Sequence, residues 1–278
     1  QFRPGVMDRL GIGYETLKAI NPNLIYCAIT GYGQTGPYKD RAGHDINYLS
    51  LAGVSSHCGR RETGPPPMGI QVADVAGGSH PAVMGILAAV IHRQQTGEGQ
   101  FIDISMTDAA FALNTMAGAA ALAGGQEQKP ESSMLNGGTF YDYYQTSDGR
   151  WLSVGSLEPQ FSDRLCDALG IPDMKSFALS QNPEHQQAIR EALKSNIAQK
   201  TLAQWQDVFA NVDACVEPVL TITEAAEHPQ LKARGMVIDV AKGNGGTQKQ
   251  IGHPIKFSAT PCESRYIGRT LGADNGDF

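Results

Sequence analysis

The amino-acid sequence predicts an α/β protein to which a smaller α+β domain is attached. A strand, a helix and a second strand follow one another between residues 24 and 105, an order typical of two parallel strands joined by a crossover helix. Beyond residue 139 the pattern changes to a hairpin signal followed by helical segments. We therefore predict four parts: a large α/β domain over residues 1–123, a linker over 124–138, a small α+β domain over 139–235, and a segment returning to the large domain over 236–278.

The elements of the large domain are predicted from their end signals. Residues 24–30 (LIYCAIT) are an apolar, β-like run that ends at a glycine turn, and residues 100–105 (QFIDIS) alternate as a second strand. Between them, residues 79–94 predict a helix with Ser79 as N-cap, Pro81 in the first turn and apolar residues on one face. Further helices are predicted at residues 14–20, 45–51 and 107–123.

The small domain is predicted to begin with a hairpin. Residues 140–146 and 150–156 flank Ser147-Asp148-Gly149, and the Asp-Gly pair favours a tight hairpin turn. Helical patterns follow at residues 159–169, 184–198 and 202–209, and β-like runs at 215–220, 237–241 and 250–257. We expect the last two runs to be closing strands.

The composition excludes several classes of protein. The chain has 278 residues, of which 41% are apolar, and its formal net charge of −6 argues against a nucleic-acid partner. The five cysteines form no CxxC pair and no HExxH motif occurs, so we expect reduced thiols and no metal site. The most apolar stretch, residues 109–123, is shorter than a bilayer span. We therefore expect a cytoplasmic protein without a membrane partner.

Asp74 is the sharpest candidate for chemistry. It lies shortly before the predicted helix start at Ser79 and is followed by Gly77 and Gly78. Free backbone N–H groups and the helix dipole favour negative charge at such a position. Asp74 is therefore either a capping residue or a carboxylate base whose neighbouring N–H groups receive a developing oxyanion.

His44 and Glu158 each have two interpretations. A lone histidine is most often structural, but Gly43 permits a close approach, and Asp45 could orient the imidazole or cap the next helix. Glu158 is either a helix-start carboxylate or one half of a buried His–Glu pair that tunes the imidazole as a base. Sequence spacing leaves open whether His44, Asp74 and Glu158 meet.

Several long motifs resemble the class III CoA-transferase superfamily and follow the order found in that family. They are RPGVMDRLG, TGYGQTGPY, GHDINYLSLAG, ADVAGGSHPAVMGILAAVIHRQQTGEGQFIDISMTDA, SDGRWLSVGSLEPQF, CVEPVLTITEA and HPQLKARGM, which together span nearly the whole chain. The form GHDINY is similar to the α-methylacyl-CoA racemase branch. The resemblance implies a class III CoA-transferase fold with an incomplete Rossmann-like large domain, because family members begin with a further segment before RPGV. It also implies an interlocked homodimer.

The resemblance implies roles for particular residues. In the racemase branch a histidine and an aspartate are the two catalytic bases and a glutamate assists the histidine; these match His44, Asp74 and Glu158. Two bases on opposite faces of the α-carbon remove and return its proton without turning the substrate. The resemblance implies no metal or redox cofactor, since CoA arrives as part of the acyl-CoA substrate.

Substrate-binding residues follow partly from the resemblance and partly from position. Arg9 matches a CoA-contacting position, and Asp45 and Tyr48 lie in a stretch that lines the CoA site in the family. For the thioester oxygen, we predict contacts from the N–H groups of Gly77 and Gly78, because both lie near the predicted helix start.

Two other functions remain open. A CoA-transferase would use Asp74 as a nucleophile on the thioester and form an aspartyl-CoA anhydride, and it would need neither His44 nor Glu158. A truncated chain that folds and dimerises without turnover is the third possibility. Loss of activity on removal of the His44 side chain would favour the racemase over the transferase.

Overall fold

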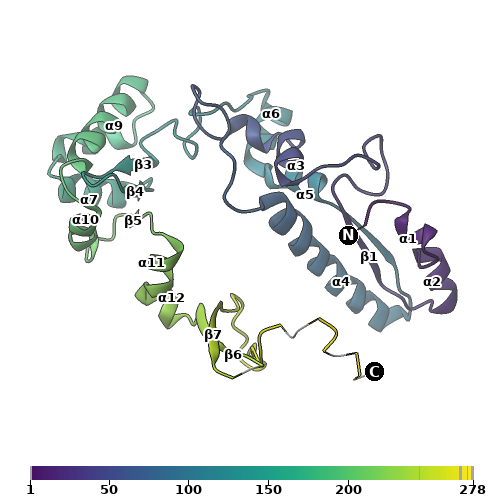
Figure 1. Cartoon of the computed structure of the whole chain (residues 1–278). Coiled ribbons are helices and arrows are strands. Elements are labelled where there is room, and N and C mark those ends of the chain that lie inside the picture. Colours follow the sequence, from purple (N-terminus) through teal and green to yellow (C-terminus); the bar gives the residue numbers. More distant parts are fainter. Residues whose placement is uncertain (1, 244, 269–270, 274, 277–278) are drawn as a thin grey trace.

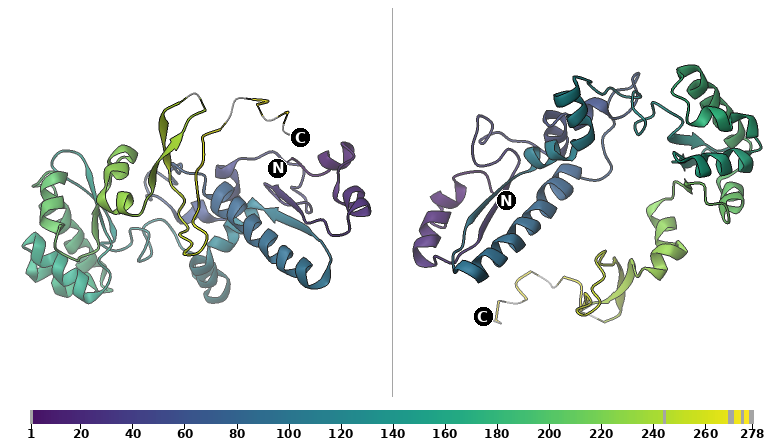
Figure 2. Two further views of the ribbon diagram at one scale, coloured as in Figure 1. Left: turned by 90° about the horizontal axis from the view of Figure 1, so that it is seen from below. Right: turned by 180° about the vertical axis from the view of Figure 1, so that it is seen from behind.

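The computed structural model describes residues 2–243, 245–268, 271–273 and 275–276. Figure 1 shows a large unit, a small unit, and an extended C-terminal arm. We define the large unit as residues 2–124, the small unit as 140–218 and the arm as 222–276. The arm leaves the small unit, and in every view its end lies nearer the large unit (Figure 1, Figure 2).

The large unit is built on two parallel strands, β1 (Tyr26–Thr30) and β2 (Phe101–Ser105). Their register pairs Tyr26 with Phe101 and Thr30 with Ser105. Helix α4 (His80–Thr96) connects them in the chain and packs against both strands. The parallel pairing predicted from the order of strand, helix and strand is therefore confirmed.

Short helices surround this pair of strands. Tyr14 covers one end of the sheet, since its ring lies 5.9 Å from that of Tyr26 and 5.3 Å from that of Phe101. The short helices are α1 (Val6–Arg9), α2 (Tyr14–Ile20), α3 (Asp45–Leu51), the 3-10 helix η1 (Val54–His57), α5 (Met106–Leu113) and α6 (Thr115–Gly124).

The helix predicted to begin at Ser79 begins earlier. A π-helical segment, η2 (Ala73–Ser79), runs directly into α4. Ser79 has helical backbone angles and caps nothing, and its hydroxyl donates to the carbonyl of Asp74 at 3.3 Å. The predicted N-cap is therefore wrong, and Asp74 lies inside the first turn of the helix rather than in a loop before it.

The long helix predicted over residues 107–123 is divided into α5 and α6 at Asn114. The Asn114 backbone leaves the helical region, with φ −74° and ψ 24°. Its side chain bonds outside the helix: the amide donates to the carbonyl of Ala52 at 2.7 Å, and the amide oxygen lies 3.1 Å from His57 Nε2. Tertiary hydrogen bonds at one residue thus break a segment that has strong local helix propensity.

The combined helix Ala73–Thr96 is long and apolar enough to cross a membrane by length and composition alone. It has 24 residues, and an 18-residue stretch within it has a mean hydropathy of 1.4, of which 22% is buried within the chain. This helix lies in a different part of the chain from residues 109–123, the apolar stretch found by sequence inspection, and it is long because η2 continues into α4. Core helices of water-soluble proteins meet the same criterion.

The small unit contains an antiparallel sheet in the order β3-β4-β5. Strands β3 (Asp142–Gln145) and β4 (Trp151–Val154) form the predicted hairpin, and β5 (Val216–Pro218) pairs with β4. Helices pack against this sheet around a core that includes Trp205, whose indole N–H donates to Ile197 O at 2.8 Å. They are α7 (Pro159–Leu169), the 3-10 helix η3 (Pro172–Met174), α8 (Lys175–Ala178), α9 (Pro183–Ile197) and α10 (Leu202–Phe209).

The arm consists of two short helices and a hairpin. They are α11 (Ile222–Glu227), α12 (Pro229–Ala233), β6 (Val237–Ala241) and β7 (Thr247–Ile251). The second closing strand was predicted at residues 250–257 and is wrong in position. The turn closes by a bond from Lys242 N–H to Gly246 O at 3.0 Å, so the chain re-enters the hairpin early, and Pro254 has no N–H to extend it.

Candidate active site

His44 and Asp74 lie on two elements that pack against each other. His44 is the N-cap of α3, and Asp74 is in the first turn of η2, which packs against α3 and α5. The loop after β1 holds this region to the start of α5, because Thr107 Oγ1 donates to Gly31 O at 2.7 Å. The pair therefore lies beyond the carboxyl ends of the two parallel strands, where ligands bind in open α/β sheets.

The surroundings of the Asp74 carboxylate disfavour its charged form. Its Oδ1 atom is buried and has no hydrogen-bond partner among the described residues. Burial raises the pKa of Asp74 most, the charge of Asp45 raises it further, and His44 opposes both effects. A carboxyl group with a raised pKa gives up and regains a proton nearer to neutral pH than an ordinary aspartate.

Asp45 lies between the two candidate bases, and its carboxylate faces the protein backbone. Its Oδ1 accepts the N–H of Ala73 at 2.6 Å and the N–H of Asp74 at 3.1 Å. These are orphan donors at the start of η2, so Asp45 caps the helix that carries Asp74 and not its own helix. Its predicted contact with CoA stays a prediction, and the structure gives its carboxylate a different task.

Tyr48 also faces inward. It is buried, its hydroxyl donates to Gly43 O at 2.5 Å, and its ring meets that of Tyr32 edge-on at 5.2 Å. Burial raises the pKa of the Tyr48 phenol, so the hydroxyl remains a donor at neutral pH. Tyr48 was predicted to line the CoA site, and in the structure it holds the loop that leads into His44.

Gly77 and Gly78 are buried inside η2. A Cβ atom at Gly77 would lie 3.1 Å from Met106 O, and one at Gly78 would lie 3.1 Å from Met106 Cγ. Glycine at both positions allows α5 to pack closely on η2. The predicted thioester contacts depended on a helix start at Ser79, and that premise is corrected here because both residues lie in the interior of the helix.

Glu158 and Arg9 lie away from this pair within one chain. Glu158 is the N-cap of α7 in the small unit, and Figure 1 shows α7 and α3 in separate units. Among the described residues, no hydrogen bond or ion pair joins Glu158 to His44. Arg9 ends α1 at the other side of the large unit, and the structure records no polar side-chain contact between it and the pair. A single chain thus brings together two of the three predicted catalytic residues.

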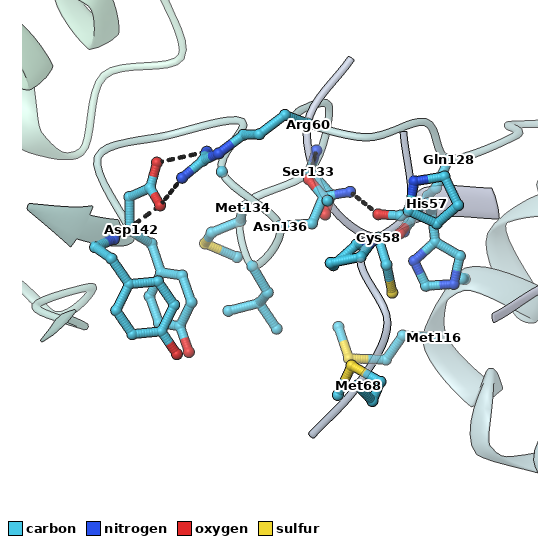
Figure 3. A pocket seen from close by; sticks show the side chains of 18 of the residues that line it. His57, Cys58, Arg60, Met68, Met116, Gln128, Ser133, Met134, Asn136 and Asp142 are labelled. Atoms are coloured by element: carbon cyan, nitrogen blue, oxygen red, sulfur yellow. Dashed lines mark hydrogen bonds and ion pairs between the residues drawn. The ribbon is translucent and has the colours of Figure 1, made fainter. Parts of the chain in front are cut away.

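A large cavity lies between the large and small units, and the sequence did not reveal it. Its volume is about 1410 Å³, and its walls include Met68, Met116 and Met134 (Figure 3). Met106, by contrast, lies against Gly78 and is not part of these walls. The walls come from the loop at residues 57–68, the junction at 113–117, the segment at 133–137, strands β3 and β4, and Cys215.

An ion pair crosses the wall of this cavity. Arg60 Nη1 and Nη2 donate to the two carboxylate oxygens of Asp142 at 2.8 and 2.6 Å (Figure 3). Glu131 accepts a further bond from Arg60 Nη1 at 3.2 Å. The bidentate pair connects a loop of the large unit to the first strand of the small unit at the cavity wall.

Within the described part of the chain, no group of three or more His, Cys, Asp or Glu side chains is arranged to hold a metal ion. A carboxyl group with a raised pKa and a neighbouring imidazole are groups that can transfer protons.

Comparisons with known proteins identify the family to which the chain is similar. The family model described as CoA-transferase family III matches residues 1–275. The α-methylacyl-CoA racemase of Homo sapiens is 38% identical over 242 residues, which cover 85% of this chain and 62% of that protein. An acetyl-CoA:oxalate CoA-transferase of Acetobacter aceti is 33% identical over 263 residues, or 92% of this chain and 66% of that protein.

The fold has a clear counterpart among solved structures. The crystal structure of a CaiB/BaiF family protein from Brucella suis matches with a TM-score of 0.83 at 28% identity, covering 99% of this chain and 72% of that chain. The chain thus spans about three fifths of the length of the human relative and almost three quarters of the length of the Brucella suis protein.

Proposed function

The chain belongs to CoA-transferase family III, and from this premise we propose that it is an α-methylacyl-CoA racemase-like isomerase. It would epimerise the 2-methyl centre of branched acyl-CoA thioesters. The observation that carries the proposal is the pairing of His44 with Asp74 on adjacent helix starts. A transferase of the kind considered above needs the carboxylate alone, whereas a racemase needs two proton-transfer groups.

The reaction is a proton transfer in two steps. One group removes the α-proton, and the electron pair of the broken C–H bond moves into the thioester to form an enolate. The second group then gives a proton to the opposite face of the α-carbon, and the thioester is restored. In one direction His44 accepts and Asp74 donates, and in the reverse direction the roles exchange. The raised pKa of Asp74 brings its proton affinity closer to that of an imidazole.

We assign the far part of the acyl chain, beyond the α-carbon, to the cavity between the two units, because the lining of this cavity includes neither His44 nor Asp74. Methionine side chains suit a chain of variable shape because they are flexible and polarisable. Arg9 remains our proposed contact for CoA, which arrives as part of the substrate. No cofactor is needed for the proton transfer described here.

Glu158 would act on His44 of a second copy of the chain. Because Glu158 and His44 belong to separate units of one chain, we propose that Glu158 of one protomer approaches His44 of the other in a homodimer. There it would accept a bond from the imidazole and raise its basicity. The interlocked dimer expected from the family would supply this arrangement.

The test is α-proton exchange. The protein is incubated with (R)- and (S)-2-methylacyl-CoA in deuterated water, and the α-position is followed by NMR. Deuterium incorporation with loss of stereochemical purity is expected. No exchange from either enantiomer would overturn the proposal.

A second candidate, the CoA-transferase, is favoured by the transferase relatives and by the unpartnered oxygen of Asp74. The intermediate named above as an aspartyl-CoA anhydride corresponds to two successive species. The Asp74 carboxylate would attack the thioester carbonyl, which gives a mixed anhydride with the acyl group and releases CoA thiolate. The thiolate would then attack the aspartyl carbonyl of this anhydride, which gives an aspartyl-CoA thioester and releases the acyl group as a free carboxylate. Movement of CoA to an added carboxylate without α-proton exchange would establish it. If neither reaction occurs, the chain is inactive as a separate unit.

A further inference from the structure

We propose that Asp45 is a positioning residue that fixes Asp74 relative to His44 by accepting the backbone N–H groups at the start of the Asp74 helix. The inference rests on the proposed function for its catalytic meaning, since it concerns the same site. It gives the Asp45 carboxylate a task that differs from the predicted contact with CoA.

The geometry carries the inference. One oxygen, Asp45 Oδ1, accepts both N–H groups, from Ala73 at 2.6 Å and from Asp74 at 3.1 Å. Asp45 follows His44 directly in the chain, and its acceptor contacts Asp74 itself and the residue before it. The connection between the two candidate bases is therefore one peptide unit, one short side chain and one pair of hydrogen bonds.

The N-cap residue of the Asp74 helix cannot accept these N–H groups with its side chain. The N-cap position of η2 is Val72, which has no side-chain acceptor, and no side-chain bond from it is present. The continuous helix from Ala73 has 24 residues, so the orphan N–H groups belong to a long helix with a full dipole. The Asp45 carboxylate, on α3, accepts two of these N–H groups. A movement of α3 would therefore displace His44 and the start of the Asp74 helix in the same direction.

The same carboxylate acts on the charge of Asp74. Asp45 raises the pKa of Asp74, and His44 lowers it. Tyr48, on the same helix as Asp45, faces the charges of both Asp74 and Arg3. The other titratable side chains on elements packed against η2 are Tyr26 and Cys27 on β1, His80, His92 and Arg93 on α4, Asp103 on β2 and Asp108 on α5. Neutralising Asp45 should therefore lower the pKa of Asp74 if the hydrogen bonds survive.

Two variants separate the hydrogen bonds from the charge. Asp45→Asn keeps an acceptor oxygen in place and removes the charge, whereas Asp45→Ala removes both. The exposed residue Asp108 on α5 supplies the matched control, Asp108→Asn, because α5 packs on the same helix segment. Each full-length variant is labelled with carboxyl-¹³C aspartate, and the Asp74 signal is assigned by its loss in Asp74→Asn.

The first measurements need no enzyme activity. In Asp45→Ala we expect amide hydrogen exchange at Ala73 and Asp74 to be at least about tenfold faster than in the native chain. Asp45→Asn should restore slow exchange and shift the titration of the Asp74 carboxyl to lower pH, while Asp108→Asn changes neither. Native-like titration of Asp74 in Asp45→Asn, or native-like amide exchange in Asp45→Ala, would overturn the inference. If Asp45→Ala does not fold, the Asp74 titration in Asp45→Asn decides alone.

The activity measurement separates this inference from the proposed function. In α-proton exchange, Asp45→Asn should move the acidic limb of the pH profile to lower pH, and Asp45→Ala should lower the rate about 10- to 100-fold. If the native chain exchanges no α-proton, the proposed racemase fails, and the amide and carboxyl measurements still decide whether Asp45 positions Asp74.

Discussion

The hydroxyl of Tyr48 donates a hydrogen bond of 2.5 Å to the carbonyl oxygen of Gly43, the residue immediately before His44. The Tyr48 ring also leaves no room for a side chain at Gly31 or Gly43. One buried ring therefore holds together the loop after β1, the loop before α3 and α3 itself. His44 begins α3 as its N-cap, so its backbone position depends on this contact.

We expect Tyr48→Phe to lower the free energy of unfolding by about 1 kcal/mol, because the ring remains while the bond to Gly43 is lost. The rate of α-proton exchange should also fall, but less than in His44→Ala, since the imidazole remains and only its backbone support changes. Urea unfolding and the exchange assay measure the two effects. Tyr14→Phe is the control, because the Tyr14 ring also packs against other rings, while its hydroxyl forms no hydrogen bond among the described residues. Native stability and native exchange in Tyr48→Phe would contradict the prediction.

Gly31→Ala and Gly43→Ala test the packing of the same ring. A Cβ atom at Gly31 would lie 2.5 Å from Tyr48 Cε1, and one at Gly43 would lie 2.7 Å from that atom. Both changes force the ring to move, and overpacking of this kind costs about 1–3 kcal/mol. Gly69→Ala should stay within about 0.5 kcal/mol of the native chain, since nothing lies within 4 Å of its Cβ position. Equal midpoints of urea unfolding for all three variants would count against this packing.

The raised pKa of Asp74 predicts that its ionised carboxylate destabilises the folded chain at neutral pH. The folded chain holds the Asp74 proton more tightly than the unfolded chain, whose aspartate has the ordinary pKa of 3.8. The contribution of this group to stability is therefore fully present below pH 3.8 and is lost as the pH rises through the folded pKa. We expect Asp74→Asn to be more stable than the native chain at pH 7 and to lose that advantage near pH 3. Thermal unfolding at the two pH values, with Asp108→Asn as control, checks the sign; a lower midpoint at pH 7 would contradict it.

Glu224, in the arm, should change stability with pH in the opposite direction to Asp74, because its pKa is lowered and not raised. Its bidentate pair with Arg150, at 3.0 and 2.8 Å, together with its bonds to Thr221, lowers the pKa of Glu224 from 4.5 to about 2. The pair and the bonds to Thr221 therefore stabilise the folded state above pH 4.5, and that stabilisation is lost as the pH falls toward 2.

Urea unfolding between pH 5 and pH 2 should therefore show a smaller loss of stability in Glu224→Gln than in the native chain. Glu62→Gln is the control, because Glu62 is exposed and forms no ion pair among the described residues. A native-like pH dependence in Glu224→Gln would show that the pair does not hold α11 to the small unit.

Local signals were sufficient for some elements and misleading for others. The bounds of α7 were predicted correctly, because Pro159 opens the helix and Gly170 follows it in the left-handed conformation. The start of η2 was missed because Gly77 and Gly78 resemble a turn, and only their packing against Met106 explains glycine inside a helix. The parallel pairing of β1 and β2 followed from element order, whereas the position of β7 depended on a turn that the pattern did not specify.

The sequence was sufficient to name the candidate residues of the site, but not the hydrogen bonds that join them. His44 and Asp74 were identified from a resemblance and from glycine-rich surroundings, and the structure places them on adjacent elements. The bond from Asp45 to the Asp74 helix joins residues 29 positions apart, and no local pattern predicts it. The cavity arises between the two units from several distant segments, so it has no signature in any one of them.

His44→Ala and Asp74→Asn provide the last prediction, which concerns stereochemistry. If each group serves one face of the α-carbon, each variant retains the base for one enantiomer and lacks the base for the other. His44→Ala should then exchange the α-proton of one enantiomer of 2-methylacyl-CoA with deuterium, Asp74→Asn should exchange the other, and both should lose racemisation by about 10²–10⁴-fold. Separate NMR time courses with each pure enantiomer measure this. Equal loss of exchange from both enantiomers in both variants would point to a single base. Native racemisation in His44→Ala would remove His44 from the reaction and leave Asp74 as the group that acts.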